Sequence, residues 1–91
     1  MTKVDWSAVG YIKRSKNRKD ALKLLETPMM PSELGKEMKI SLTHASKIVR
    51  ELNSQSLVKC LNDGLKVGRI YRTTSKGMKV REEAEKYGSD K

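Results

Sequence analysis

The stretch Leu34–Leu52, LGKEMKISLTHASKIVREL, carries the clearest structural pattern in this sequence. Its apolar residues form two stripes of helical period, and the phase of the pattern resets between Lys39 and Ser41. Pro31 suits the start of the first helix, and Ser41 is a candidate N-cap for the second. The pattern therefore predicts two helices joined by a turn of about three residues, a helix-turn-helix motif.

Three residues bear on how these two helices meet. Gly35 lies inside the first helix, where glycine costs about 1 kcal/mol relative to alanine, and this cost is explained if the second helix crosses there at close range. Ala45 is the small residue expected on the other side of the crossing. Lys39 stands in the turn, where a left-handed backbone conformation would cost about 1–2 kcal/mol.

The composition indicates a single basic domain spanning residues 1–91. Hydrophobic residues make up 36% of the chain and aromatic residues only 4%, so the core must be built from aliphatic side chains. The formal net charge of +9 favours a polyanionic partner. Nucleic acid ranks first among such partners, ahead of an anionic membrane surface.

The single cysteine and the hydropathy pattern point to a cytoplasmic protein. Cys60 has no second cysteine with which to form an intramolecular disulfide, which fits a reducing compartment. No apolar run approaches the roughly 18 residues of a membrane span, and the start of the chain lacks the apolar region of a signal peptide. We expect no membrane association.

Two helices are predicted ahead of the motif. Thr2 and Asp5 stand in capping-box spacing before a helix over about 3–14, and Ser15 is a candidate N-cap for a helix over about 16–26. Between Lys13 and Lys23, six cations and one carboxylate leave a surplus of +5. Such a run is either a solvated face or a phosphate-contacting surface, and cations at a helix start oppose the helix dipole.

The pattern changes after the motif. Two β-rich segments, over about 57–62 and 69–74, are joined by DGLKVG and predict a β-hairpin. Thr74 is a candidate N-cap for a last helix over about 75–87. We expect this helix to turn Met78, Ala84 and Tyr87 to one face and Glu82, Glu83 and Glu85 to solvent.

This order of elements is that of a winged helix-turn-helix domain. The stretch over about 15–79 resembles small archaeal winged-helix transcription regulators, related to the MarR and ArsR groups. The resemblance rests on RKDALKLL, SLTHASKIVREL, LVKCLN and GRIYRTTSKG. It departs from the family at Lys39 and Ser56, where glycine is usual. The expected fold class is α+β, mostly α, with the motif over about 31–55, the wing over about 57–74 and helices at both ends.

The resemblance implies that the second helix of the motif enters the major groove and that the wing tip contacts backbone or minor groove. Lys47 could donate to guanine, and Thr43 could meet a thymine methyl group or a phosphate. Serine hydroxyls and Arg50 are better suited to phosphates. The candidate DNA contacts are Ser41, Thr43, His44, Ser46, Lys47 and Arg50 on the motif, and Lys66, Arg69 and Arg72 on the wing.

The leading hypothesis is a sequence-specific regulator that binds double-stranded DNA as a homodimer, because one helix reads only a few base pairs. The candidate dimer-interface residues lie on the first and last helices: Trp6, Val9, Ile12, Met78 and Tyr87. The alternative hypothesis is a winged-helix interaction module that binds protein or structured RNA in a larger assembly.

An enzyme is not expected. The sequence has no phosphate-binding glycine loop, nucleophile elbow or metal-ligand cluster. His44 and Cys60 lack metal-ligand spacing, so neither a metal nor a cofactor is predicted. We interpret Tyr71 as wing core rather than a base-stacking platform, and Cys60 as packed rather than redox-active. No residue points to a small-molecule effector.

Overall fold

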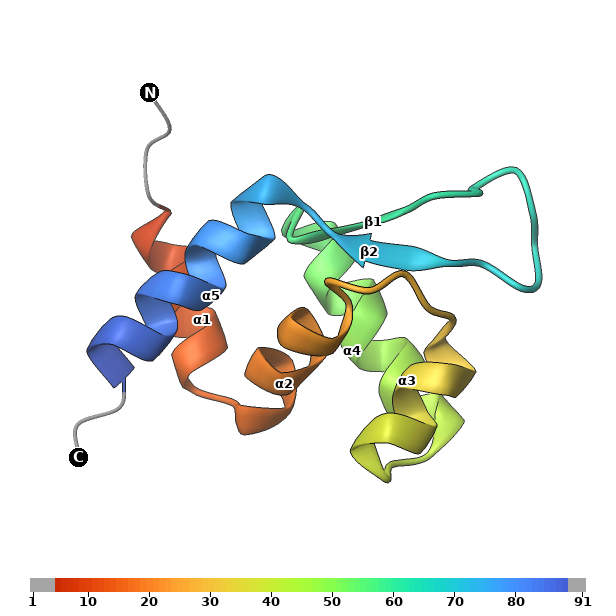
Figure 1. The fold of residues 1–91 in the computed structure, drawn as a ribbon, viewed down its shortest axis with the longest axis horizontal. Coiled ribbons are helices and arrows are strands. Elements are labelled where there is room, and N and C mark those ends of the chain that lie inside the picture. Colours follow the sequence, from red (N-terminus) through yellow and green to blue (C-terminus); the bar gives the residue numbers. More distant parts are fainter. Residues whose placement is uncertain (1–4, 89–91) are drawn as a thin grey trace.

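The computed structural model describes residues 5–88, which form helices and a two-stranded antiparallel hairpin in the predicted order (Figure 1). The elements are α1 (Trp6–Lys13), α2 (Lys16–Leu24), α3 (Pro31–Met38), α4 (Leu42–Ser54), β1 (Val58–Cys60), β2 (Tyr71–Thr73) and α5 (Ser75–Gly88). In Figure 1, α1 and α5 lie side by side at one end, and the hairpin loop extends at the other. The predicted winged helix-turn-helix architecture is confirmed.

Side-chain caps set where the helices begin. Ser15 Oγ accepts a hydrogen bond from Arg18 N at 3.3 Å, and Thr74 Oγ1 accepts one from Gly77 N at 3.0 Å, as predicted. Asp5 is the N-cap of α1 and has extended backbone angles, so α1 begins at Trp6 rather than near residue 3. Thr2 lies outside the described residues. The helix α2 ends at Leu24, two residues earlier than predicted.

The helix-turn-helix is held together by a close backbone contact. Gly35 and Ala45 are both buried where α3 meets α4. A Cβ atom at residue 35 would lie 3.1 Å from the carbonyl oxygen of Ile40 and 3.5 Å from Ala45 Cβ. The predicted crossing is therefore confirmed, and it accounts for the glycine inside α3.

Two residues other than glycine have left-handed backbones. Lys39 ends α3 with φ 60° and ψ 43°, and Ser56 follows α4 with φ 63°. These are the two positions at which the sequence departs from the glycine usual in the resembling family. The turn geometry is thus kept, with strain at both positions.

The core is aliphatic and is shared by every helix and by β1. Its fully buried side chains include Ile12, Leu22, Leu34, Leu52 and Val80, contributed by α1 to α5 respectively. Tyr71 is half-buried and packs against this core, as expected for wing core.

One prediction for α5 was wrong. Glu83 is nearly fully buried rather than solvated, and its carboxylate lies 3.8 Å from Lys79 Nζ. The reason is the rotation of the helix, which turns Gly77, Val80 and Ala84 inward at helical spacing. Residue 83 lies one turn after Val80 and shares that face.

The strands are shorter than predicted because side chains replace backbone pairing near the tip. Val58 pairs with Thr73 and Cys60 with Tyr71, and Leu61 N still donates to Ile70 O at 2.8 Å. Residues 61–70, between the two strands, form a loop that is longer than the six residues expected.

The strand β2 is fixed on both edges. One edge pairs with β1, and on the other Tyr71 exchanges two backbone hydrogen bonds with Met29, in the segment between α2 and α3. Thr73 N donates to Leu25 O at 2.8 Å, and Thr73 Oγ1 donates to Leu22 O at 2.7 Å. The wing is therefore anchored to α2 and to the start of the helix-turn-helix.

Replacing Lys39 or Ser56 with glycine should stabilise the chain. Relief of left-handed strain, about 1–2 kcal/mol, outweighs the extra entropy of an unfolded glycine, about 0.4–1 kcal/mol. We expect each variant to raise the free energy of unfolding by about 0.5–1 kcal/mol, as measured by urea denaturation. Lys36→Gly, exposed within α3, is the matched control and should lower it by about 1 kcal/mol. A loss of stability in Lys39→Gly equal to that of Lys36→Gly would contradict the strain argument.

Gly77→Ala should be strongly destabilising. A Cβ atom there would overlap the carbonyl oxygen of Leu57 and lie 2.7 Å from Thr73 Cγ2. Since backbone atoms on one side must shift, we expect a loss of about 3 kcal/mol in thermal or urea unfolding. Gly64→Ala is the control, because its added Cβ meets nothing within 4 Å, and it should change stability by less than about 0.5 kcal/mol. Equal effects of the two substitutions would refute the packing argument.

Candidate nucleic-acid interface

The second helix of the motif, α4, has one buried and one exposed face. Ser41 Oγ accepts a hydrogen bond from His44 N at 3.0 Å and starts the helix at Leu42, as predicted. The buried face consists of Ala45, Ile48, Val49 and Leu52. The exposed face presents the side chains expected to contact DNA: Thr43, His44, Lys47 and Arg50, with Ser46 half-buried at its edge.

Glu51 lies at the edge of this exposed face, one helical turn after Lys47. It is half-buried, and its Oε1 accepts a hydrogen bond from the Tyr11 hydroxyl at 3.1 Å. Partial burial and then this hydrogen bond raise the pKa of Tyr11 above its ordinary value. The carboxylate is thereby directed toward α1, and Glu51 also lines a cavity together with His44 and Lys47.

Arg18 contacts the same tyrosine, Tyr11. Its guanidinium lies 3.7 Å from the centroid of the Tyr11 ring and donates to the Tyr11 carbonyl at 2.9 Å. This arginine belongs to the basic run over 13–23, in which Lys13, Arg14, Lys16 and Lys23 are exposed. Part of the run is thus structural, while its exposed members extend the positive surface.

A small cavity connects that run to α4. It has a volume of about 180 Å³ and is lined at the start of α2 by Ser15, Asn17 and Arg18, and on α4 by His44, Lys47, Ile48 and Glu51. The start of α2 and the exposed face of α4 therefore form one continuous polar surface.

A groove lies between α4 and the wing. It has a volume of about 560 Å³. Its lining combines apolar side chains, Leu42, Val49, Val67 and Tyr71, with polar and basic ones, Ser46, Arg50, Asn53, Lys66 and Arg69. This mixture of basic and apolar groups suits the sugar–phosphate backbone, which presents charged oxygens and apolar sugar faces.

The wing loop is organised by a residue that the sequence analysis treated only as a strand end. Asn62 Oδ1 accepts from Ile70 N at 2.8 Å, and Asn62 Nδ2 donates to Gly68 O at 3.1 Å. Cys60 Sγ lies 3.4 Å from the same Oδ1. The one available signal was the Asp63-Gly64 turn that follows Asn62.

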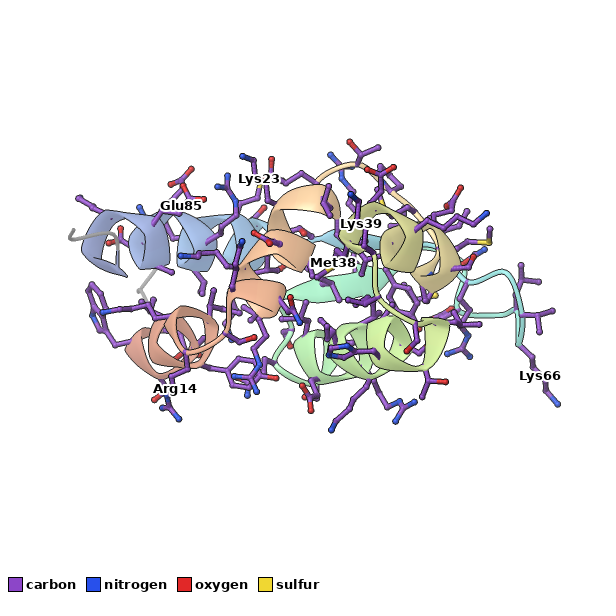
Figure 2. All side chains as sticks on the ribbon, turned by 90° about the horizontal axis from the view of Figure 1, so that it is seen from below. Arg14, Lys23, Met38, Lys39, Lys66 and Glu85 are labelled. Carbon is purple, nitrogen blue, oxygen red and sulfur yellow. The ribbon has the colours of Figure 1, made fainter. Side chains whose placement is uncertain are left out.

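The predicted wing contacts have different surroundings. Lys66 is exposed at the far end of the loop and points away from the helices (Figure 2). Arg69 is half-buried and directed into its own loop, with Nε 2.6 Å from Leu65 O. Arg72 is exposed on β2 directly opposite Lys59 on β1. Like charges at such a position are mutually destabilising, and an anion placed between them relieves that repulsion.

The predicted dimer-interface residues are divided between core and surface. Val9 and Ile12 are buried in the core of the chain itself, so their side chains are covered without a second subunit. Trp6 is 58% exposed, and Met78 is half-buried. The side chain of Tyr87 lies outside the described part of the structure.

Among residues 5–88, no cluster of three or more histidine, cysteine, aspartate or glutamate side chains could hold a metal ion. None of the helices in this range is both long and apolar enough to span a membrane.

Comparison with known proteins identifies the fold. No protein-family model matches the chain, and no curated protein sequence is significantly similar to it. Among solved structures, a mutant of MarR from E. coli complexed with operator DNA matches with a TM-score of 0.71 at 19% identity, over 88% of this chain and 59% of MarR. The chain has the winged-helix fold of MarR.

Two other regulators match similarly. A mutant of ZitR from Lactococcus lactis in complex with DNA gives a TM-score of 0.66 at 24% identity, over 84% of this chain and 53% of ZitR. The transcriptional regulator BldR from Sulfolobus solfataricus gives 0.71 at 20% identity, over 89% of this chain and 63% of BldR. The chain thus spans only about half to two-thirds of the length of these proteins. The likeness to MarR structures supports that part of the predicted resemblance; the archaeal group stays a prediction.

Asn62→Ala should loosen the wing without unfolding the domain. The substitution removes the side-chain acceptor of Ile70 N and the donor to Gly68 O, and two such bonds contribute about 1–2 kcal/mol in total. We expect faster amide hydrogen exchange at Ile70, with protection in α2 and α4 unchanged. Asn53→Ala, exposed on α4, is the control and should leave exchange at Ile70 unaltered. Unchanged exchange in Asn62→Ala would show that the loop is held by other contacts.

Proposed function

We propose that this chain binds double-stranded DNA sequence-specifically and acts as a transcription regulator. The observation that carries the proposal is the exposed polar and basic face of α4 beside a groove with a basic lining, at the base of an extended wing. The same fold occurs in MarR and ZitR structures solved with DNA. A net charge of +9 supports a polyanionic partner.

The first half of α4 supplies the proposed base-reading residues. Thr43, His44 and Lys47 are all exposed there. Lys47 donates to guanine O6 or N7 in the major groove, and the Thr43 methyl group meets a thymine methyl group.

Phosphate contacts fix the register of the protein on the duplex. On the motif these come from Arg50 and from the hydroxyls of Ser41 and Ser46. The Ser41 oxygen already accepts from His44 N, and its proton stays available to a phosphate. On the wing, Lys66 and Arg72 are the proposed phosphate contacts, because both are exposed.

We further propose that the functional unit is a homodimer. A single helix reads only a few base pairs, and two-fold pairing doubles the site. The helices α1 and α5 pack side by side and lie away from the hairpin loop (Figure 1), and they carry the exposed Trp6 and the half-buried Met78. A large indole exposed at such a place suits a subunit contact.

The test is selection of bound duplexes from a random DNA pool at near-physiological salt. Enrichment of a palindrome with half-sites about one helical turn apart would support both sequence-specific binding and the dimer. Salt-sensitive binding without an enriched sequence, or a preference for structured RNA, would replace the proposal with the interaction module. No binding to nucleic acid would refute it.

Lys47→Ala should weaken binding to the selected duplex by about tenfold, because one base-edge contact contributes about 1–3 kcal/mol. The slope of log affinity against log salt concentration should change little if Lys47 contacts a base, and should fall by about 1 if it contacts a phosphate. Fluorescence anisotropy measures both quantities. Lys79→Ala removes the same charge from α5 and should leave affinity within about twofold. Equal effects of the two variants would exclude a specific role for Lys47.

A further inference from the structure

The tip of the wing is apolar on either side of its lysine. Val67 is 83% exposed and Leu65 is 51% exposed, with Lys66 between them. Figure 2 shows Lys66 at the outermost point of the loop. An exposed aliphatic pair at the most extended part of a basic hairpin has no role in the core of the chain.

The tip is nevertheless held in one shape. Arg69 Nε donates to Leu65 O at 2.6 Å, and its Nη2 lies 3.4 Å from Asp63 O. Leu65 N donates to Asn62 O at 3.0 Å, and Asn62 Nδ2 donates to Gly68 O at 3.1 Å. The loop therefore presents Leu65 and Val67 without a large loss of conformational entropy on binding.

We propose that Leu65 and Val67 form an apolar wedge that enters the minor groove of DNA, and that Arg69 is a positioning residue which holds the wedge rather than a phosphate contact. The inference rests on the proposed function and deepens it. Aliphatic side chains are used as wedges in the minor groove, where they contact sugars and base edges.

The charge around the tip favours DNA over an apolar protein surface as the occupant. Lys66 lies within the wedge, and Lys59 and Arg72 face each other on the exposed side of the hairpin behind it. Asp63 is the one acidic side chain among residues 58–73. Apolar groups flanked by cations match the minor groove, whose sugar walls are bordered by two rows of phosphates.

The proposed wedge should make binding depend on the groups that base pairs present in the minor groove. In the minor groove, a G·C pair differs from an A·T pair by the guanine N2 amino group on the groove floor. Inosine lacks this amino group but keeps the major-groove pattern of guanine. An apolar wedge meets the amino group unfavourably, so it should prefer I·C pairs to G·C pairs, whereas α4 in the major groove should not distinguish them.

The experiment compares binding of the full chain to poly(dI-dC) and poly(dG-dC) duplexes of equal length by fluorescence anisotropy. We expect the wild type to bind poly(dI-dC) severalfold more tightly. The double variant Leu65→Ser/Val67→Ser should lose this preference and about tenfold in affinity for poly(dI-dC), with an unchanged salt slope because no charge is removed. Leu61→Ser, at the base of the loop with 47% exposure, is the matched control and should retain the preference.

Arg69→Lys separates positioning from phosphate contact. Lysine keeps the charge but cannot reproduce the guanidinium contacts to Leu65 O and Asp63 O, so the preference for poly(dI-dC) should shrink while the salt slope stays constant. Full retention of the preference in Arg69→Lys would overturn the positioning role. Equal binding of the wild type to both polymers, or retention of the preference in the double variant, would overturn the wedge. Failure of the wild type to bind either duplex would instead overturn the proposed function itself.

Discussion

The close approach of α3 to α4 at Gly35 is the contact on which the rest of the structure depends. With no side chain at this position, the carbonyl oxygen of Ile40 can approach the helix, and Gly35 O accepts a hydrogen bond from Ile40 N at 2.9 Å. This contact sets the direction in which the chain leaves the turn, and hence where Ser41 begins α4. Because α4 carries both the core residues Ile48 and Leu52 and the exposed basic face, a single backbone contact fixes the core packing and the orientation of the interface together.

Local features of the fold could be predicted from the sequence, because their causes are local. Ser15, Ser41 and Thr74 cap the helices that follow them through hydrogen bonds spanning three residues, and such bonds are encoded in short spacings. Glu83 was misjudged because helical periodicity shows which face is polar, not whether other parts of the chain cover its edge. The Tyr11–Glu51 hydrogen bond could not be predicted from periodicity either, since it joins residues 40 positions apart. Periodicity likewise identified Val9 and Ile12 as apolar, but could not tell a core from a subunit interface. Asn62 was missed because its side chain substitutes for backbone pairing, which no strand pattern records.

The two ends of the molecule differ in how their charged side chains are paired. On α5, Lys76, Lys79 and Arg81 pair with carboxylates, including Glu26, just after α2, at 2.7 Å from Arg81. At the other end, cations face one another, as Lys59 and Arg72 do across the hairpin. Pairing of opposite charges stabilises the fold where α5 packs, whereas the uncompensated charge at the wing lowers stability in the absence of an anion. The surface that is electrostatically least favourable to folding is therefore the one best prepared for a polyanion.

The two-sided anchoring of β2 has a consequence for molecular shape. Because β2 is bonded to β1 on one edge and to Met29 on the other, the hairpin leaves the body at an angle set by the segment that also leads into α3. The distance from the exposed face of α4 to the loop tip is therefore set by the fold. In the proposed complex, this fixed distance has to match the pitch and groove dimensions of the double helix. A-form duplexes differ in both, since they have a deep, narrow major groove and a wide, shallow minor groove. If the proposed function holds, discrimination between helical forms would thus arise from rigid geometry, before any individual base is read.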